Sequence, residues 1–548
     1  MNVLIVVPRF KETDELTRIY TPIFIPVGLA YISAALKEAG IKSAFLNLNL
    51  CRDDVEEKIK KVLSQEDYGY VLTGGLSVHY KAVKRCIQSV RKYAPPARVV
   101  LGGGMISSQP ELMWKHLRPD YLVIGEGEET IVDLVKCSEQ NDDLSLIAGI
   151  GYSSREGELV LTRSRYPIEN INALPWPDYE GVGLDAVLNQ ILPSQSNIYD
   201  VLDHPRAYPL IASRSCPYQC TFCFHPIGNK YRQRSIANIM EELRHAHNRY
   251  RFNIIDVFDE LFSHDKQRVL EFCKSIKELS IELKTDIKWN CQMRVDTTDE
   301  ELMESMKDAG LHCLSLGLES YSQTVLTSMR KRIKPSQIDK SIKIARRYGM
   351  AITGNFIFGD RAETLETANE TLDYWKKNHD LFGTSISLGF IEPYPGTALY
   401  KHCLSKGLIT DEIDFVENHI FDYINMSETM TAAEFEQLKR EIHKAYLGFE
   451  KKDSAWPSDI SFNNGEWEVR VRCPYCGKES LYRNYIPPSE KEGRRHIYCR
   501  HCKIRFFLLP HLSRREKMRR SLVRIGHNVL GDSGISYLRK IYKTIKML

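Results

Sequence analysis

The first 150 residues alternate short apolar runs with longer segments whose apolar residues recur at helical spacing. The apolar runs predict strands at residues 2–8, 42–50, 68–77, 97–104 and 119–130. Between them, amphipathic patterns predict helices that cover residues 27–40 and 80–93. This alternation indicates an open parallel sheet with helices on both faces, and hence a doubly wound, flavodoxin-like α/β domain over residues 1–150.

Glycines gather where three of these strands should end. In open α/β sheets ligands bind at the carboxyl ends of the strands, and glycine there lets a bulky ligand approach the backbone. One such turn would be an ordinary tight turn, but three in one sheet favour a ligand crevice. Its candidate residues are Gly74, Gly75, Gly102, Gly103, Gly104, Gly125, Glu126 and Gly127.

A second strand–helix series follows a connector at residues 151–206, which is rich in proline and glycine and weak in periodicity. Apolar runs predict six more strands, at residues 208–215, 253–259, 288–295, 313–320, 349–359 and 385–396. Helical stretches lie between them, for example at residues 235–250 and 267–279. Six strand–helix repeats predict a partial (β/α)6 TIM-type barrel over residues 207–450, with its chemistry at the carboxyl ends of the strands.

Three cysteines follow the first of these strands directly, as Cys216, Cys220 and Cys223 in a C-x3-C-x2-C array. Three thiolates on one loop can hold three irons of a cubane cluster, which usually takes four protein cysteines. The missing fourth ligand would leave one iron open for a substrate or cofactor. The alternative is a zinc site completed by His225, whose position two residues after Cys223 is awkward for closing the same tetrahedron.

With Phe222 inside it, this array is the signature of radical SAM enzymes. Residues 1–450 resemble the cobalamin-dependent subgroup of that family, in the motifs "DVFDELF", "GLES", "GNFIFG" and "EPYPGT" and in the N-terminal loops "LGGGMISSQPE" and "IGEGEET". The resemblance implies a [4Fe-4S] cluster on the three cysteines, S-adenosylmethionine on its open iron, and cobalamin at the glycine-rich edge of the N-terminal domain.

The resemblance also implies roles for single residues. Glu319, followed by Ser320, matches the ribose-binding segment, and Ile357 matches the strand that lies against the adenine. Asp259 and Glu260 match an acidic segment that could contact the methionyl ammonium. Each of these carboxylates could instead cap a helix.

Three arginines are further candidates for the site. Arg232 and Arg234 could bind an anionic group of a ligand, and Arg294 could reach into the site. For Arg294, a surface or salt-bridged position is an equal alternative.

The family mechanism is a reductive cleavage of S-adenosylmethionine, after which methylcobalamin can donate a methyl group to the substrate. The function expected is methylation of an unactivated carbon, or of a phosphinate-type centre, in a small molecule. The alternatives are cyclisation or rearrangement without methyl transfer, and a degenerate barrel that serves as a binding protein. An external electron donor of the flavodoxin or ferredoxin type is also implied, and the sequence assigns no catalytic side chain.

One departure from many cobalamin proteins concerns the metal ligand. The D-x-H-x-x-G motif, which supplies a histidine to the cobalt, is absent. His79 lies in a comparable region but outside that context, and is interpreted as an ordinary surface or turn residue. Bound cobalamin is therefore expected in its base-off form without a histidine from that motif.

A second cysteine cluster lies near the C-terminus, in a unit predicted over residues 466–510. Cys473, Cys476, Cys499 and Cys502 form C-x2-C…C-x2-C, a spacing typical of zinc ribbons. An auxiliary iron–sulfur cluster is the alternative. This short unit has too little apolar core to fold without a metal, so the site is expected to be structural.

Composition narrows the class of protein. A chain of 548 residues with 43% hydrophobic residues fits two to four domains, and a net charge of +4 is too balanced to predict a nucleic-acid partner. No secretory signal and no apolar run of roughly 18 residues is seen, so a cytoplasmic protein is expected. Seven scattered cysteines are interpreted as small core residues: Cys51, Cys86, Cys137, Cys273, Cys291, Cys313 and Cys403.

The C-terminal tail, residues 511–548, is basic, with apolar residues at helical spacing. One apolar and one basic face would suit a peripheral contact with an anionic membrane surface or an acidic partner. The alternative is a helix docked on the rest of the protein, which the glycines that interrupt the pattern favour.

Overall fold

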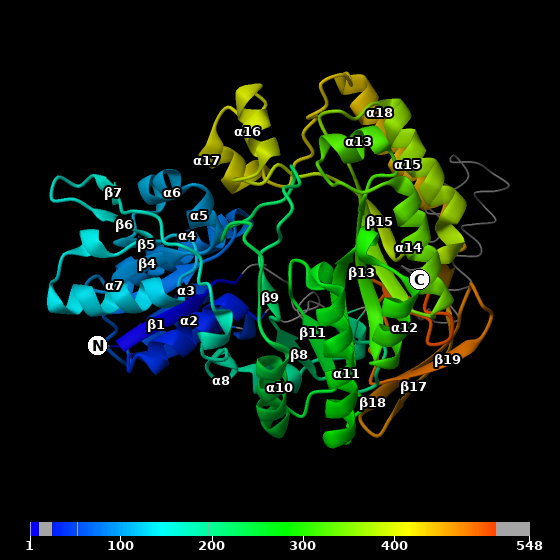
Figure 1. The fold of residues 1–548 in the computed structure, drawn as a ribbon, viewed down its shortest axis with the longest axis horizontal. Helices are drawn as coiled ribbons and strands as arrows, with labels where there is room; N and C mark the ends of the chain where they lie inside the picture. Colours follow the sequence, from blue (N-terminus) through cyan, green and yellow to red (C-terminus); the bar gives the residue numbers. More distant parts are fainter. Residues whose placement is uncertain (1, 10–24, 52, 197, 511–548) are drawn as a thin grey trace, which may run out of the picture.

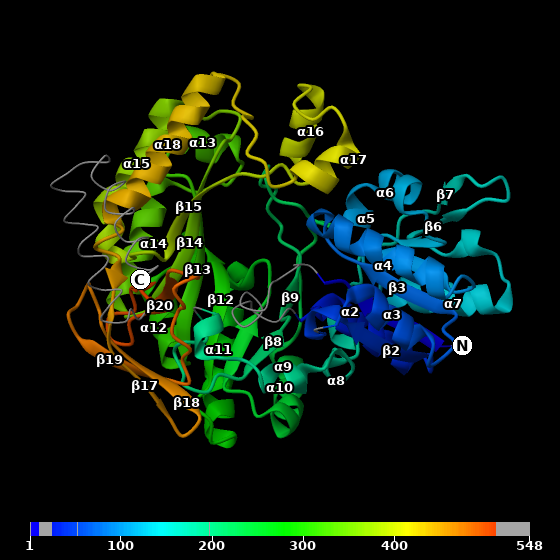
Figure 2. The same ribbon diagram turned by 180° about the vertical axis from the view of Figure 1, so that it is seen from behind.

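The computed structural model describes residues 2–9, 25–51, 53–196 and 198–510. Figure 1 shows a sheet domain in blue and cyan, a larger curved sheet with its helices in green, and a small β unit in orange. The view from behind shows the sheet domain and the orange unit on opposite sides of the curved sheet (Figure 2). The basic tail lies outside the described residues, and no helix in the described part is long and apolar enough to cross a membrane.

The N-terminal sheet has seven strands in the order β2-β1-β3-β4-β5-β6-β7. The first five are parallel, and β6 and β7 continue the sheet as an antiparallel hairpin. The strands are β1 (Asn2–Val7), β2 (Lys42–Asn47), β3 (Tyr70–Gly74), β4 (Arg98–Gly102), β5 (Tyr121–Val123), β6 (Ile150–Ser153) and β7 (Leu159–Leu161). The order of the parallel strands is that of flavodoxin-like folds, so the predicted fold class is confirmed.

Alternate residues of each buried strand point to opposite faces of this sheet, and helices cover both faces. On β1, Leu4 and Val6 pack in one core with helices α3 and α4, whereas Val3 and Ile5 pack in another with α2 and α7. The helices of the domain are α2 (Val27–Glu38), α3 (Val55–Leu63), α4 (Tyr80–Tyr93), α5 (Gly104–Ser108), α6 (Pro110–Leu117) and α7 (Glu128–Gln140).

The sheet departs from the prediction in two places. The strand expected over residues 42–50 ends at Asn47, whose side chain accepts a hydrogen bond from the Asn49 amide and starts a 3-10 turn. The hairpin of β6 and β7 falls mostly in the segment interpreted as a connector. Its strands have only four and three residues, and several of their side chains are half-exposed, so they give little periodicity. Two short helices follow, α8 (Tyr179–Val182) and α9 (Leu184–Leu188).

The central domain is a curved sheet of six parallel strands in the order β15-β14-β13-β12-β11-β8. Its edge strands β15 and β8 do not pair with each other, so the barrel is partial, as predicted. The strands are β8 (Ala207–Leu210), β11 (Ile254–Val257), β12 (Lys288–Arg294), β13 (Leu311–Glu319), β14 (Ala351–Phe358) and β15 (Ile386–Phe390). A short hairpin, β9 (Ser213–Arg214) and β10 (Arg232–Gln233), brackets the cysteine array.

Helices cover the convex face of this sheet. On β12, Cys291 and Met293 are buried against them, whereas Gln292 between these two is exposed on the concave side. The helices of the domain are α10 (Ile236–Tyr250), α11 (Lys266–Glu282), α12 (Glu300–Asp308), α13 (Gln323–Ser328), α14 (Pro335–Arg347), α15 (Leu365–Asn378), α16 (Ala398–Ser405), α17 (Glu412–Asp414) and α18 (Ala432–Phe449).

Local sequence fixes where these helices begin. The Ser235 hydroxyl accepts a hydrogen bond from the Asn238 amide at the start of α10. At the start of α11 the Asp265 carboxylate accepts one from the Gln267 amide. Such caps satisfy amide groups that have no partner inside the helix, so the chain leaves each strand and enters its helix at a defined residue.

The C-terminal unit consists of two small three-stranded sheets. Its strands are β16 (Ser454–Ala455), β17 (Pro457–Asn463), β18 (Glu466–Arg472), β19 (Glu479–Arg483), β20 (Arg495–Tyr498) and β21 (Arg505–Leu508). The unit therefore starts before residue 466, since β17 pairs with β18. It packs against the barrel near the beginnings of β13 and β14, where the Tyr498 hydroxyl donates to the Ile352 carbonyl at 2.7 Å.

Candidate active site

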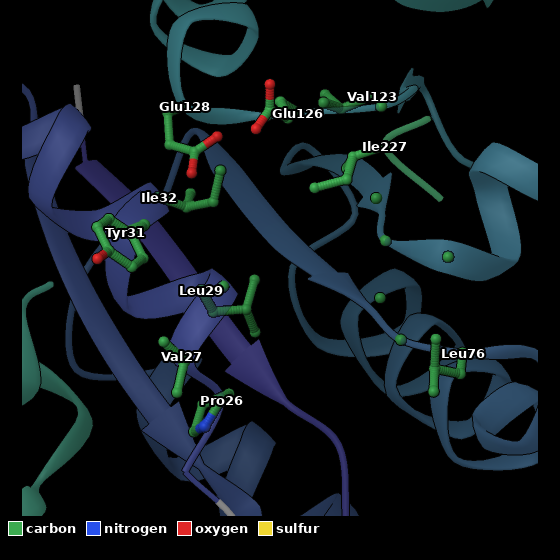
Figure 3. A pocket seen from close by; sticks show the side chains of 18 of the residues that line it. Pro26, Val27, Leu29, Tyr31, Ile32, Leu76, Val123, Glu126, Glu128 and Ile227 are labelled. Atoms are coloured by element: carbon green, nitrogen blue, oxygen red, sulfur yellow. The ribbon is translucent and has the colours of Figure 1, made fainter. Parts of the chain in front are cut away.

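A cavity of about 510 Å³ lies between the glycine-rich edge of the N-terminal sheet and the hairpin that leads into the cysteine array. The hairpin side includes Arg214 and Ser215, which directly precede Cys216. Figure 3 shows apolar side chains around the cavity, among them Leu29 and Ile32 of α2. All eight predicted crevice residues line it, namely Gly74, Gly75, Gly102, Gly103, Gly104, Gly125, Glu126 and Gly127. A largely apolar cavity of this kind suits a large ring ligand.

The glycines of this edge serve two different purposes. A Cβ on Gly74 would lie 2.1 Å from the Gly102 carbonyl oxygen, so Gly74 is needed because two neighbouring turns pack backbone against backbone. Gly125 has a φ of 82°, and a Cβ there would meet no atom within 4 Å. Its Cα therefore faces open space, which is the position where a ligand can approach the backbone.

His79 also lines this cavity. It ends a 3-10 turn after β3, where its Nδ1 accepts a hydrogen bond from the Leu76 amide at 3.1 Å. Burial lowers the pKa of His79 to about 4, so the ring is neutral at physiological pH. The residue is part of the turn, as predicted, but it lies at the cavity and not on an outer surface.

The Glu126 side chain is already engaged by the barrel domain. Its carboxylate accepts hydrogen bonds from Arg214 at 2.8 Å, and from Arg232 and the Ile168 amide at 2.6 Å each. Burial alone would raise the pKa of Glu126, but the hydrogen bonds from the two arginines outweigh it and hold the pKa below its ordinary value. We therefore interpret Glu126 as a residue that joins the two domains, and its backbone as the part next to a ligand.

The cysteine array sits on the loop between β9 and β10. Ser215, directly before Cys216, has a φ of 67°, which turns the chain sharply out of β9. Three thiolates on one loop suit a cubane, whose irons occupy separate corners. His225, the fourth ligand of the zinc alternative, lies 3.6 Å from the Glu260 carboxylate.

Cys220 is surrounded by groups that favour its thiolate. A hydrogen bond from Cys223 is the largest cause that lowers the pKa of the Cys220 thiol, and nearby Lys331 and Arg294 contribute. Phe222, between the two cysteines, is partly buried and packs in the core that includes helices α3 and α4. The loop is thus anchored by an aromatic ring on one side and faces cations on the other.

The residues matched to S-adenosylmethionine binding lie at the ends of β13 and β14. Glu319 has a φ of 62° and is 2.6 Å from the buried Lys331 ammonium. Ile357 is partly buried on the neighbouring strand. Ser320 is fully buried, and its hydroxyl lies 3.1 Å from that of Thr371 on α15, so its side chain turns away from Glu319 toward the helix layer.

The two acidic residues after β11 have different surroundings. Asp259 is buried, and its carboxylate accepts hydrogen bonds from the Ala212 amide at 2.7 Å and the Ser213 hydroxyl at 2.6 Å. Burial raises its pKa to about 6. It therefore holds the start of the cluster hairpin and caps no helix. Glu260 lines the cavity, 3.6 Å from His225, and is the one of the pair with access to a ligand.

The three arginines considered for the site, two of them for anion binding, all have internal partners. Arg232 binds Glu126, and Arg234 forms an ion pair with Glu242 at 2.5 Å in which both side chains are almost fully buried. Arg294 binds Asp296 through two contacts of 3.0 Å and stacks on Tyr218. These contacts favour the salt-bridged interpretation for Arg294 and give the same role to the other two.

Sequence reasoning missed two residues of this region. Arg214 stands two residues before Cys216, and its place near the end of a predicted strand is the only signal in the sequence. Lys331 lies 12 positions after Glu319, in a basic segment that carries no motif. Its role is visible only once the fold brings it to Glu319 and Cys220.

The C-terminal cysteines form a metal centre. The ligand atoms of Cys473, Cys476, Cys499 and Cys502 all lie within 4.8 Å of one another. The Sγ atoms of Cys473 and Cys502, and of Cys476 and Cys499, are 3.7 Å apart. This is the edge of about 3.8 Å expected of a tetrahedron of sulfurs around one zinc-sized ion, and the geometry favours such an ion over a second cluster.

Comparisons with known proteins assign separate family matches to the N-terminal sheet domain and to the partial barrel. The Radical SAM superfamily matches residues 210–374, and the B12 binding domain matches residues 20–135. The chain is 27% identical to an uncharacterized methyltransferase of Pyrococcus horikoshii, over 85% of this chain and 96% of that one. It is also 27% identical to the anaerobic magnesium-protoporphyrin IX monomethyl ester cyclase of Rubrivivax gelatinosus, over 70% and 67% of the two chains.

Solved structures share the fold. The radical S-adenosylmethionine methyltransferase TsrM of Kitasatospora setae, with cobalamin and a [4Fe-4S] cluster bound, matches with a TM-score of 0.59 and 17% identity, over 73% of this chain and 75% of that one. The cobalamin-dependent S-adenosylmethionine radical enzyme OxsB matches with a TM-score of 0.56 and 18% identity, over 87% and 64%.

The predicted cofactor set is confirmed: a [4Fe-4S] cluster, S-adenosylmethionine and cobalamin, together with a four-cysteine metal site near the C-terminus. The N-terminal sheet, the cysteine loop and the partial barrel are thus the parts of one known enzyme architecture. The chain combines a Radical SAM superfamily domain with a B12 binding domain, the combination found in cobalamin-dependent radical SAM enzymes.

Proposed function

We propose that this enzyme methylates an unactivated carbon, or a phosphinate-type centre, of a small-molecule substrate. The observation that carries the proposal is the shared cavity, because one wall is the glycine-rich edge of the B12-binding domain and the other leads directly into the cluster loop. Both cofactor sites would therefore border the same cavity, as a transfer between them requires.

The residues present fit the groups that the family uses. Cys216, Cys220 and Cys223 would hold three irons of the cluster, and the open space beside the Gly125 backbone leaves room for a corrin ring. When bound, these groups supply the one-electron cleavage of S-adenosylmethionine and a transferable methyl group. The protein's own task is to hold them in place and to keep water out.

Several side chains serve this task directly. Phe224, one residue after the array, packs between two turns: a Cβ on Gly104 would lie 3.1 Å from its ring, and one on Gly396 would lie 2.4 Å from it. The ring thus fills the space between the B12-binding domain and the turn after β15 and excludes solvent there. Beside the cluster loop, the Lys331 ammonium lies 2.6 Å from the Glu319 carboxylate and orients it, so that it could accept hydrogen bonds from ribose hydroxyl groups.

Relatives with named activities favour methyl transfer. The chain is 23% identical to the cytidylyl-2-hydroxyethylphosphonate methyltransferase of Streptomyces wedmorensis over 71% of its length. It is 27% identical to the bacteriochlorophyllide d C-8(2)-methyltransferase of Chlorobaculum tepidum over 57%. Cyclisation is the second candidate, because the magnesium-protoporphyrin ester cyclase resembles this chain to a similar degree. The intact array and the cavity argue against a degenerate barrel.

The reconstituted enzyme, incubated with a reductant, a cell extract and S-adenosylmethionine labelled in its methyl group, tests the proposal. We expect a labelled small-molecule product and 5′-deoxyadenosine, and neither with the Cys216→Ala, Cys220→Ala, Cys223→Ala triple variant. Formation of 5′-deoxyadenosine with label in no product would favour cyclisation or rearrangement. Formation of 5′-deoxyadenosine by the triple variant would refute the assignment of the cluster.

We further propose that the electron for cleavage of S-adenosylmethionine comes from an external donor of the flavodoxin or ferredoxin type.

We also propose that the basic residues 511–548 contact an anionic surface. The full-length protein should then sediment with anionic liposomes at low salt, whereas a chain that ends at residue 511 should stay in solution. Equal recovery of both proteins in the supernatant would leave the tail as a packing element.

A further inference from the structure

A buried group of four charges joins the two cofactor loops. Arg214 donates to Glu126 at 2.8 Å and to Glu128 at 2.6 Å, and Arg232 donates to Glu126 at 2.6 Å. The four side chains are between 3% and 11% exposed. Two positive and two negative charges balance, so the group can be buried without a net charge.

Each end of this group is attached to a cofactor loop. Glu126 and Glu128 flank Gly127 in the turn after β5, and all three residues line the cavity. Arg214 and Arg232 are directly paired across the β9–β10 hairpin. That hairpin carries the whole cysteine array.

Two further contacts extend the group to both sides. The Arg232 guanidinium donates to the Ser215 hydroxyl at 3.3 Å, one residue before Cys216. The Arg214 guanidinium lies 4.9 Å from the centre of the Tyr31 ring, which belongs to α2 and lines the cavity. Arg232 therefore contacts groups on both sides of the junction, whereas Arg214, which itself belongs to the cluster hairpin, contacts groups of the N-terminal domain.

Arginine is the residue that this geometry requires. The planar guanidinium of Arg214 uses two separate nitrogens for two carboxylates, which a lysine ammonium cannot do with the same directions. Apolar packing between the domains would tolerate sliding, whereas several short charged hydrogen bonds of fixed direction define one arrangement. Buried ion networks are known to contribute more to a unique geometry than to net stability in some proteins.

We infer that Arg214 and Arg232 are positioning residues that fix the B12-binding domain relative to the cluster loop, and so set how the two cofactors face one another. The inference rests on the proposed function, since it assumes that both cofactors bind at this junction. It predicts that loss of Arg214 disturbs the relative placement of the cofactors more than the binding of either one.

Pulsed EPR on the doubly loaded protein tests this. With cob(II)alamin and the one-electron-reduced cluster both paramagnetic, the dipolar interaction between them reports their separation and its spread. The variants are Arg214→Met, Arg214→Lys and Glu128→Gln. The matched control is Arg249→Met, because Arg249 also bridges two carboxylates, Glu180 and Asp185, but on the surface.

In wild type and in Arg249→Met we expect one well-defined interaction. In Arg214→Met we expect iron and cobalt contents like those of wild type, but a broad spread of dipolar interactions in place of the single one. We expect partial recovery of the single interaction in Arg214→Lys. An unchanged interaction in a fully loaded Arg214→Met would overturn the inference. If Arg214→Met does not bind both cofactors, Glu128→Gln decides, because it removes one charge and keeps an oxygen acceptor. A broadened dipolar interaction in Glu128→Gln supports the inference, and an unchanged one overturns it.

Measurements on the wild-type protein distinguish failure of this inference from failure of the proposed function. Failure of wild type to retain cobalamin while its cluster forms would refute the proposed function, and the positioning role with it. A loaded wild type whose interaction is matched by every variant would refute the positioning role alone.

Discussion

Replacement of Arg234 by methionine should destabilise the barrel strongly, although a role in anion binding would predict little change in stability. Arg234 and Glu242 form an ion pair at 2.5 Å with side chains that are 3% and 2% exposed. The arginine also donates to the Asn238 side chain and to the Ile211 carbonyl, at 2.8 and 3.0 Å. Methionine fills part of the same volume but leaves the Glu242 charge without its partner.

The loss of stability comes from the Glu242 charge, which stays buried without its partner. Without Arg234, Glu242 keeps the hydrogen bond from the Tyr208 hydroxyl at 2.7 Å, but its charge is uncompensated in a buried site. Breaking a buried pair in this way typically costs about 3–5 kcal/mol. This is a large share of the roughly 5–15 kcal/mol that stabilises a typical folded domain.

Urea unfolding, followed by far-UV circular dichroism under anaerobic conditions, measures this effect. The control is Arg244→Met, because the pair of Arg244 and Glu282 is 48% exposed on both sides and should contribute at most about 1 kcal/mol. The double variant Arg234→Met, Glu242→Gln removes the stranded charge and keeps an acceptor for Tyr208, so it should regain most of the loss. An Arg234→Met protein within about 0.5 kcal/mol of wild type would refute the reasoning.

Three further predictions concern other parts of the molecule. Burial raises the pKa of the fully buried Glu363 from 4.5 to about 8, so the protein loses stability as pH rises from about 4.5 to about 8, where the unfolded chain ionises this group and the folded protein keeps it neutral. Glu363→Gln should therefore remove a fall of up to about 5 kcal/mol in the free energy of unfolding between pH 4.5 and 9. A variant that shows the same fall as wild type would count against this prediction. Cys476→Ser should lower the melting temperature and release about one zinc per chain with cluster iron unchanged, whereas loss of iron would indicate an auxiliary cluster. EPR of bound cob(II)alamin should show no nitrogen hyperfine splitting, in wild type as in His79→Ala; a splitting that disappears in the variant would instead make His79 a cobalt ligand.

The sequence was sufficient for the architecture because apolar periodicity is a local property. Helix α4 begins and ends where the pattern predicts, at Tyr80 and Tyr93, and six predicted strands form the barrel. The glycine-rich edge was also predictable, since parallel strands place their carboxyl ends together. The hairpin of β6 and β7 was missed because strands of three or four half-exposed residues carry too little pattern.

The partners of charged side chains could not be predicted in the same way. Glu126 was expected beside a ligand, but its carboxylate binds Arg214 and Arg232, 88 and 106 positions further along the chain. Asp259 was expected to face a ligand or cap a helix, and it binds Ala212 and Ser213 of a neighbouring loop instead. Such pairings depend on how separate elements come together, and no local motif encodes them.

The central claim is that a cluster and a corrinoid occupy the two sides of one cavity, and the metal content after anaerobic reconstitution tests it most directly. Protein reconstituted with iron, sulfide and hydroxocobalamin, and freed of unbound cofactor by gel filtration, should hold about four cluster irons and about one cobalt per chain. The triple variant of Cys216, Cys220 and Cys223 should lose the cluster iron and keep the cobalt. Wild-type protein that loads its cluster but retains no cobalt would contradict the account.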